Sequence, residues 1–365
     1  MSNTTFFLPA FGNRPAQLVD RELVINNFVH GLSQPVGHPD RAVLLIGQRG
    51  MGKTALLLEF ADRAEQLAFV VPRVTATENI LEDLLGAIQL KGSRFIHDKP
   101  KVKGVSAGAF GFSVGLTFSE DVERNFSFVN KLTLLADELA KHGKGLVILV
   151  DEIQTHTSSL RILTTAFQHL VGENKNIVIV MAGLPHAISS TLSDEVLTFF
   201  NRAKKVYLGP LSLSAVSVFF TKVFTELGKK ISRENLALIV EATRGYPYLL
   251  QLIGFYLLEY VGSAKSITRE HIENAIVSAK RDMVENIYDP VLKPLSQKDL
   301  QFLTAMVKDV GASRVTDIKT RMKTSNAVVQ AYRKRLIDAG VIASERRGEL
   351  AFTIPYIDEY LRGEF

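Results

Sequence analysis

The run Gly47-Gln48-Arg49-Gly50-Met51-Gly52-Lys53-Thr54 matches the phosphate-loop pattern G-x-x-x-x-G-K-[ST] in full. It follows Ala42–Ile46, a short apolar segment typical of a buried strand, and it precedes a predicted helix over 54–67. Glycines allow backbone N–H groups to turn inward onto phosphate oxygens, and the N-terminus of the helix adds the positive end of its dipole. We therefore expect this loop and Ala55 to bind the phosphates of a nucleotide.

Two side chains of the loop have specific expected roles. Lys53 supplies positive charge to the β- and γ-phosphates, and the Thr54 hydroxyl ligates Mg²⁺. The alternative is a chance glycine-rich turn, but the preceding strand and the following helix favour the nucleotide site.

A second apolar strand, Gly145–Val150, is followed directly by Asp151 and Glu152. In open α/β sheets, ligands bind at the carboxyl ends of the strands. We expect Asp151 to hold the Mg²⁺ shell and Glu152 to orient and polarise the attacking water. Alone, the pair could equally be solvated acids at a strand end; a phosphate loop earlier in the chain favours catalysis.

Strands alternate with helices over the first 210 residues. Further strands are predicted at 69–75, 177–182 and 206–208, and further helices at 20–31, 78–90, 126–142 and 159–171. Near-continuous apolar strands separated by helices indicate a parallel sheet covered on both faces, which is an α/β P-loop NTPase core.

After Pro210 the pattern is helical, with helices predicted at 212–228, 232–242, 246–261 and 268–286. Pro290 and Pro294 then indicate a boundary. A chain of 365 residues is too long for one compact core of ordinary size. We predict a lead-in, a nucleotide-binding core, a helical lid and a C-terminal α+β domain, at 1–40, 41–210, 211–290 and 291–365.

Composition excludes several kinds of chemistry. The chain has no Cys, so it has no disulfide, no Cys-ligated zinc and no thiol catalysis, which fits a cytoplasmic location. Its eight His residues form no metal-binding spacing. We expect no membrane partner, because the sequence has no signal peptide and no apolar run of about 18 residues. A net charge of +5 permits a nucleic-acid partner without requiring one.

Three other features have open interpretations. Residues 104–119, rich in Gly, Ser and Phe, indicate a β-hairpin or mobile insertion that serves as a lid, a subunit contact or a DNA-touching loop. Arg202 either reaches the γ-phosphate of a neighbouring subunit, which we favour, or faces a helix dipole. Arg244 faces either nucleotide or solvent.

The C-terminal domain resembles a winged helix-turn-helix. Three helices are predicted, at 296–310, 315–323 and 326–339, followed by a hairpin whose strands are 341–345 and 350–354. Thr324 and Ser325 form the turn before the third helix, and Gly340 ends that helix. Val329, Tyr332 and Leu336 share its buried face.

Positive charge is concentrated in this domain, where residues 314–347 hold nine basic and three acidic side chains. We expect double-stranded DNA to bind the exposed helix face and the wing, through Asn326, Gln330, Arg333, Lys334, Arg346 and Arg347. Arg and Gln would reach bases in the major groove, while Lys contacts a phosphate. The alternatives are a domain that contacts protein or inhibits the ATPase, and a basic helix face that is only solvated. The charge and the wing arginines favour DNA.

Residues 15–285 resemble the AAA+ and STAND ATPases, and within them the archaeal and bacterial ATPases related to origin-recognition initiators. Asp151-Glu152-Ile-Gln154 matches the Walker B form D-E-x-Q of that family. Residues 17–23, Gln-Leu-Val-Asp-Arg-Glu-Leu, resemble the box that packs near adenine, with Asp20 where glycine is usual. Residues 206–211 match the link into the lid. Ala182–Pro185 takes the sensor 1 position without its usual polar residue.

Gly245-Tyr246-Pro247 is similar to the G-x-P signature of STAND proteins, in place of the sensor 2 arginine usual in initiators. The resemblance implies an ATP- and Mg²⁺-dependent switch, homo-oligomeric in its ATP state and acting in replication initiation or on a mobile element. One alternative is a STAND-like signalling or defence ATPase whose winged helix contacts protein. Another is a transposition or helicase-loading ATPase that assembles on DNA.

Overall fold

The computed structural model describes residues 6–10, 15–96, 127–153, 158–192 and 200–364. The chain divides into two compact units. The sheet unit comprises residues 23–46 and 56–207, and the helical unit comprises residues 1–22, 47–55 and 208–365. Two sequence predictions, the hairpin at 104–119 and the Walker B Gln154, lie outside the described residues.

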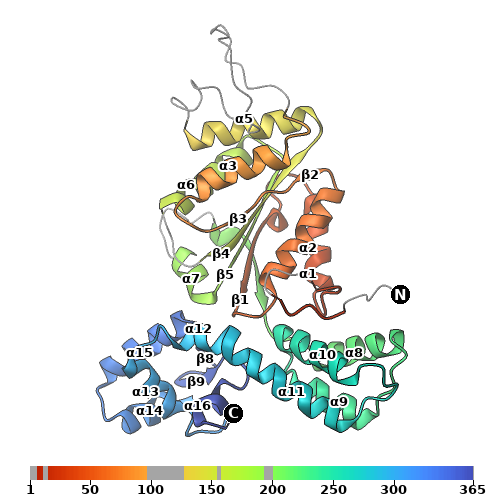
Figure 1. The fold of residues 1–365 in the computed structure, drawn as a ribbon. Coiled ribbons are helices and arrows are strands. Elements are labelled where there is room, and N and C mark those ends of the chain that lie inside the picture. The colour runs from red at the N-terminus through yellow and green to blue at the C-terminus, as the bar shows by residue number, and fades with distance from the viewer. Residues whose placement is uncertain (1–5, 11–14, 97–126, 154–157, 193–199, 365) are drawn as a thin grey trace, which may run out of the picture. The chain divides into compact units, whose positions relative to one another are not determined.

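A six-stranded sheet forms the centre of the sheet unit (Figure 1). Its strands are β1 (Ala42–Gly47), β2 (Phe69–Val70), β3 (Arg73–Thr75), β4 (Gly145–Ile153), β5 (Ile177–Gly183) and β6 (Lys204–Leu208). Their order is β2-β4-β5-β1-β6, with β3 also paired to β4. The β1–β5, β2–β4, β3–β4 and β4–β5 pairs are parallel, which confirms the predicted α/β class. Pro72 lacks the N–H needed for a continuous ladder, and the strand predicted at 69–75 is accordingly interrupted there.

Helices cover both faces of this sheet (Figure 1). They are α1 (Glu22–Leu32), α2 (Lys53–Gln66), α3 (Ile80–Lys91), α5 (Phe128–Lys141), α6 (Ser158–Gly172) and α7 (Pro185–Leu192). Alternate residues of the central strands, such as Ile148 and Ile179, share one buried cluster with α3, α5 and α6. On α1 and α2, the rings of Phe28 and Phe60 stack at 4.0 Å between centroids. Burial on both faces explains the continuous apolar strands in the sequence.

The register of the sheet aligns the carboxyl ends of β1 and β4. Gly183 at the end of β5 lies opposite Ile46 of β1 and also opposite Ile153 of β4. The chain therefore enters the phosphate loop at the same edge of the sheet at which β4 presents Asp151 and Glu152.

The helical unit contains the predicted lid helices α8 (Leu213–Glu226), α9 (Arg233–Ala242), α10 (Pro247–Val261) and α11 (Arg269–Met283). Ser212, Ser232 and Thr268 cap the N-termini of α8, α9 and α11 with side-chain hydrogen bonds. A π-helical turn (Val284–Tyr288) and α12 (Asp289–Leu292) continue directly from α11. Pro290 does not end this helical course, because it lies in the first turn of α12.

The last part of the helical unit combines helices with a small sheet. Its elements are α13 (Gln297–Met306), β7 (Ser313–Arg314), α14 (Val315–Met322), α15 (Asn326–Asp338), β8 (Ile342–Ser344), β9 (Glu349–Phe352) and α16 (Ile357–Arg362). The strands form an antiparallel sheet in the order β7-β9-β8. The sequence predicted these three longer helices and the hairpin, but not β7 or α16. In the described part of the chain, no helix has the length and apolarity needed to cross a bilayer.

Candidate nucleotide site

The phosphate loop connects β1 to α2, and two of its glycines adopt left-handed backbone. Gly50 has φ +71° and Gly52 has φ +81°, a region that favours glycine over residues with a Cβ. A Cβ at Gly52 would meet no other atom within 4 Å. Met51 between them is buried, with 5% of its surface exposed, and anchors the loop. The loop is thus a fixed turn with open space at Gly52.

Lys53 begins α2, and its ammonium group lies against the loop itself. It donates hydrogen bonds to the carbonyl oxygens of Gly47 at 2.8 Å and Gln48 at 2.9 Å. Thr54 follows on the first turn of the helix, where a helix N-terminus attracts anions. A cationic side chain, a helix N-terminus and a glycine turn with open space fit the phosphates of a nucleotide bound with Mg²⁺.

Tyr246 of the G-x-P sequence contacts the phosphate loop, which the sequence did not predict. Its hydroxyl donates a 2.6 Å hydrogen bond to the carbonyl oxygen of Arg49, and only 1% of its surface is exposed. Burial raises the pKa of Tyr246 above its ordinary value, so the hydroxyl keeps its proton and remains a donor. A Cβ at Gly50 would lie 2.3 Å from this hydroxyl oxygen, so the loop needs glycine there for a second reason.

The box at residues 17–23 contacts the link between β6 and α8. Arg21 donates a 2.7 Å hydrogen bond to the carbonyl of Gly209, and burial lowers the pKa of Arg21. The N–H of Ser212 donates to the Asp20 carboxylate at 2.8 Å. Asp20 has φ +57°, a conformation that aspartate tolerates better than most residues. Glycine adopts this left-handed backbone most readily, which fits the glycine that the resembled box has at this position.

The two acids at the end of β4 differ in exposure, and the strand is irregular there. The register of β4 against β5 shifts between Val150 and Ile153. Asp151 is buried, with 8% exposed, and its carboxylate accepts the N–H of Glu152 at 2.9 Å. Glu152 is exposed and has φ +55°, which is costly for a residue with a Cβ. Strained backbone of this kind is often found at functional sites.

The two weaker arginine predictions have different outcomes. Arg202 is exposed just before β6, and no ion pair joins it to any described residue, so both of its interpretations remain predictions. Arg244 is exposed, with 43% of its side chain accessible, as the solvent interpretation expected, and its guanidinium also pairs with Glu359 of α16 at 2.8 Å. The sequence did not predict α16, so it gave no signal for this partner.

The predicted DNA-contacting residues lie on α15 and in the β8–β9 turn. Asn326, Gln330 and Lys334 are exposed on α15, and Arg346 and Arg347 are exposed in the turn. Arg333 is half-buried and donates to Gln330 at 3.1 Å and to Ser344 of β8 at 2.8 Å. It therefore joins α15 to the hairpin, which the sequence did not indicate.

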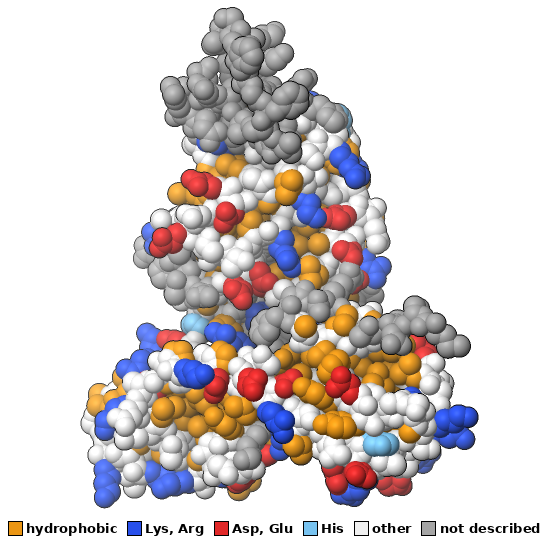
Figure 2. All heavy atoms as spheres, viewed as in Figure 1, with side chains coloured by type: hydrophobic (Ala, Val, Ile, Leu, Met, Phe, Trp, Pro, Cys, Tyr) orange, Lys and Arg blue, Asp and Glu red, His pale blue; other side chains and the backbone are white. Residues whose placement is uncertain are grey.

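Some basic residues of this domain are neutralised by acids outside the basic stretch. Arg335 pairs with the buried carboxylate of Asp299 at 2.7 Å, and Arg321 binds Asp309 through both terminal nitrogens. In Figure 2, further Lys and Arg side chains lie along the outer edge of the region where Figure 1 labels α14 and α15. The net positive charge of this domain that is available to a partner is therefore smaller than the count of basic residues suggested. Part of that charge lies on the surface.

Comparison with solved structures shows the same fold in archaeal proteins. The Walker-type ATPase PabY2304 of Pyrococcus abyssi superposes with a TM-score of 0.66 at 17% identity, covering 96% of this chain and 97% of its own. The ORC2 protein of Aeropyrum pernix, solved as ADPNP–ADP complexes, has a TM-score of 0.66 at 15% identity, with 97% and 94% covered. Cdc6p from Pyrobaculum aerophilum has a TM-score of 0.53 at 15% identity, covering 98% of this chain and 97% of its own.

In sequence comparison, the two parts of the chain match different family models. No curated protein matches it. Residues 285–361 match a domain of unknown function, DUF8462. Residues 18–253, more than half of the chain, match the model of an ATPase domain predominantly from Archaea. That span contains the phosphate loop, Asp151, Glu152 and Tyr246, and the chain is a member of this family of P-loop ATPases.

Proposed function

We propose that this protein binds ATP with Mg²⁺, hydrolyses it to ADP and phosphate, and binds double-stranded DNA through its C-terminal domain. The observation that carries the proposal is the complete phosphate loop together with the strained acidic end of β4, in a chain whose C-terminal domain exposes basic residues. Family membership supports the ATPase part.

Each residue has a proposed role in hydrolysis. The loop amides of residues 47–55 bind the phosphates, and Lys53 stabilises the charge that develops on the γ-phosphate. We assign Thr54 and Asp151 as protein ligands of Mg²⁺, which neutralises phosphate oxygens when bound. Glu152 orients the attacking water and accepts its proton. Arg202 of a neighbouring copy would stabilise the transition state in a homo-oligomer formed with ATP.

The C-terminal domain would bind DNA as a winged helix. Its order of elements, with β7 before α14 and the β8–β9 hairpin after α15, supports that assignment. Asn326, Gln330 and Lys334 would face the major groove, and Arg346 and Arg347 of the wing would contact the backbone or the minor groove. Because Arg333 is held by Ser344, we expect it to fix the wing against α15 as well as to contact DNA.

The test is duplex-DNA binding by fluorescence anisotropy, with and without ATP, over a series of salt concentrations. Changing Arg346 and Arg347 together to alanine should weaken binding at least about tenfold and reduce the salt slope by about two. The matched control changes two exposed lysines of the same domain, Lys298 and Lys308, and should leave the affinity nearly unchanged. An absence of binding at low salt, or equal losses in both variants, would refute the DNA part.

A second candidate function is a STAND-like signalling switch, which the Gly245-Tyr246-Pro247 sequence favours. In that case the C-terminal domain contacts protein rather than DNA. Size-exclusion chromatography with light scattering, run with and without ATP and DNA, separates the two. A monomer with nucleotide that ignores DNA supports the switch, whereas an ATP-dependent assembly on DNA supports the main proposal.

A further inference from the structure

The turn between α9 and α10 has one end on the phosphate loop and the other on the C-terminal domain. Tyr246 contacts the loop through the carbonyl of Arg49. Two residues earlier, Arg244 contacts α16 through Glu359. The part of the chain that joins these two contacts is a single turn, so movement at either end affects the other.

The turn itself is fixed by its own hydrogen bonds. Thr243 is fully buried, and its hydroxyl accepts the N–H of Gly245 at 3.1 Å. The N–H of Tyr246 donates to the carbonyl of Thr243 at 2.8 Å. The carbonyl of Gly245 accepts the N–H of Leu211 at 2.7 Å, and a Cβ at Gly245 would lie 2.3 Å from the Leu211 carbonyl oxygen. The turn therefore has little freedom to change shape between its two ends.

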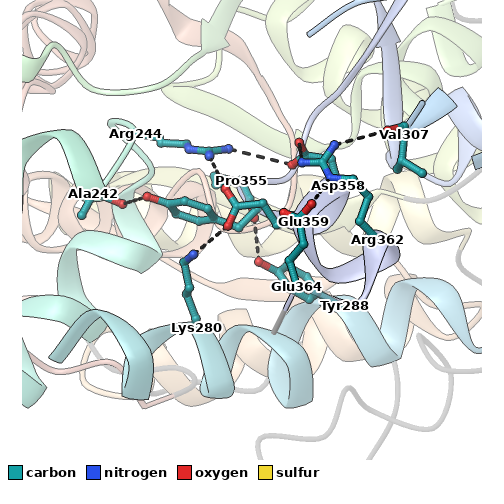
Figure 3. Close-up of polar contacts among 11 residues, drawn as sticks. Ala242, Arg244, Lys280, Tyr288, Val307, Pro355, Asp358, Glu359, Arg362 and Glu364 are labelled. Atoms are coloured by element: carbon teal, nitrogen blue, oxygen red, sulfur yellow. Dashed lines mark hydrogen bonds and ion pairs between the residues drawn. The ribbon is translucent and has the colours of Figure 1, made fainter. Parts of the chain in front are cut away.

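The C-terminal end of the link is a cluster around α16 (Figure 3). The Glu359 carboxylate accepts hydrogen bonds from Arg244 at 2.8 Å and from Lys280 of α11 at 2.7 Å. The same two cations lie over the ring of Tyr356, at 3.7 and 4.2 Å from its centroid. The Tyr356 hydroxyl donates to the buried carbonyl of Ala242 at 2.8 Å. Two charges and an aromatic ring thus hold the start of the turn.

Arg244 needs such support because its backbone is left-handed, with φ +47°. A residue with a Cβ keeps this conformation only where its surroundings impose it. Its contacts with Glu359 and Tyr356 provide that constraint, and they come from the C-terminal domain rather than from the lid.

We propose that Glu359 and Tyr246 are positioning residues of the nucleotide site, so that the C-terminal domain helps to set the conformation of the phosphate loop. Glu359 holds Arg244, the rigid turn transmits that position, and the Tyr246 hydroxyl holds residues 49–50 of the loop. Nucleotide affinity then depends on whether α16 is docked on the lid. This inference rests on the proposed nucleotide binding.

The experiment measures the dissociation constant of a fluorescent ATP analogue with Mg²⁺ in the full chain. We expect Tyr246→Phe and Glu359→Gln each to weaken binding by about three- to tenfold, the equivalent of about one hydrogen bond. Together they should weaken it little more than either alone, since both act through one turn.

Two matched variants serve as controls. Tyr256→Phe removes another lid hydroxyl, which donates to Asp282 at 2.8 Å away from the loop. Asp309→Asn removes a carboxylate that is 24% exposed and bound to Arg321, compared with 22% for Glu359, but contacts no lid residue among those described. Both should keep the affinity within about twofold of wild type.

The outcomes separate this inference from the proposed function. The link would be overturned if Glu359→Gln bound the analogue with wild-type affinity. It would also be overturned if the losses of affinity in Tyr246→Phe and Glu359→Gln added fully in the double variant. If Tyr246→Phe does not fold, the affinity of Glu359→Gln compared with that of Asp309→Asn decides whether the link exists. Both of these substitutions lie far from the loop in sequence. Failure of the wild-type chain to bind nucleotide would instead refute the proposed function.

Discussion

Replacing Glu152 by glycine should stabilise the protein while abolishing ATP turnover. Glu152 is exposed and has φ +55°, which costs a residue with a Cβ about 1–2 kcal/mol. Glycine removes that cost but adds about 0.5–1 kcal/mol of unfolded-chain entropy. The expected net gain is about 0.5–1 kcal/mol in the free energy of unfolding, which corresponds to an increase of about 1–4 °C in Tm.

Glu152→Gln is the matched control for this prediction. It keeps the left-handed backbone strain, so its Tm should stay close to that of wild type. Both variants lose the carboxylate that accepts a proton from water, so both should lose at least about 100-fold in ATP turnover. Ala68→Gly provides a reference for the strain, because Ala68 also has a positive φ, +66°, at a turn away from the acids.

Differential scanning fluorimetry and a phosphate-release assay measure the two effects. If Ala68→Gly raises the Tm but Glu152→Gly lowers it, the strain argument fails at the acidic end of β4. If Glu152→Gln turns over ATP at the wild-type rate, Glu152 is not the group that activates water.

Three further predictions concern other parts of the chain. Gly50→Ala should reduce nucleotide affinity at least about tenfold, measured by fluorescence titration, because its Cβ would meet the Tyr246 hydroxyl. Asp299→Asn should lower the free energy of unfolding by about 1–2 kcal/mol at pH 7 in urea titrations. Desolvation raises the pKa of Asp299, but hydrogen bonds from Ser296 and Arg335 outweigh it and hold the folded-state pKa below its ordinary value. The contribution of Asp299 to stability is therefore present above the unfolded pKa and is lost as pH falls through the folded pKa. Mixing inactive Arg202→Ala with inactive Glu152→Gln should restore some turnover if Arg202 acts in trans; no recovery in a mixed assembly would contradict that role.

Local patterns predicted most of the elements that position the nucleotide site. The strand before Gly47, the helix after it and the strand before Asp151 follow from short apolar runs and glycine punctuation, which depend on neighbouring residues alone. The same holds for the lid helices, because Ser212 and Ser232 cap them locally.

The features that the sequence did not reveal depend on contacts distant in the chain. Tyr246 and Arg49 are 197 residues apart, and Arg244 and Glu359 are 115 apart, so no local pattern indicates either contact. Arg335 pairs with Asp299, which lies outside the basic stretch 314–347. The count of basic residues in that stretch therefore overestimated the charge available to DNA. The irregularity of β4 at Asp151 and Glu152 depends on the register of β4 against β5, which periodicity does not specify.

The most direct test of the nucleotide site is calorimetric titration of ATP with Mg²⁺ into the wild-type chain and into Lys53→Ala. Lys53 donates hydrogen bonds to two carbonyls of the loop. Without its side chain, we expect the glycines and Tyr246 to keep the loop in its conformation. We predict saturable binding at one site per chain in the wild type and a loss of at least about tenfold in Lys53→Ala, with an unchanged Tm in the absence of nucleotide. Equal affinities in the two proteins, or no binding by the wild type, would contradict the assignment of residues 47–55 as the ATP site.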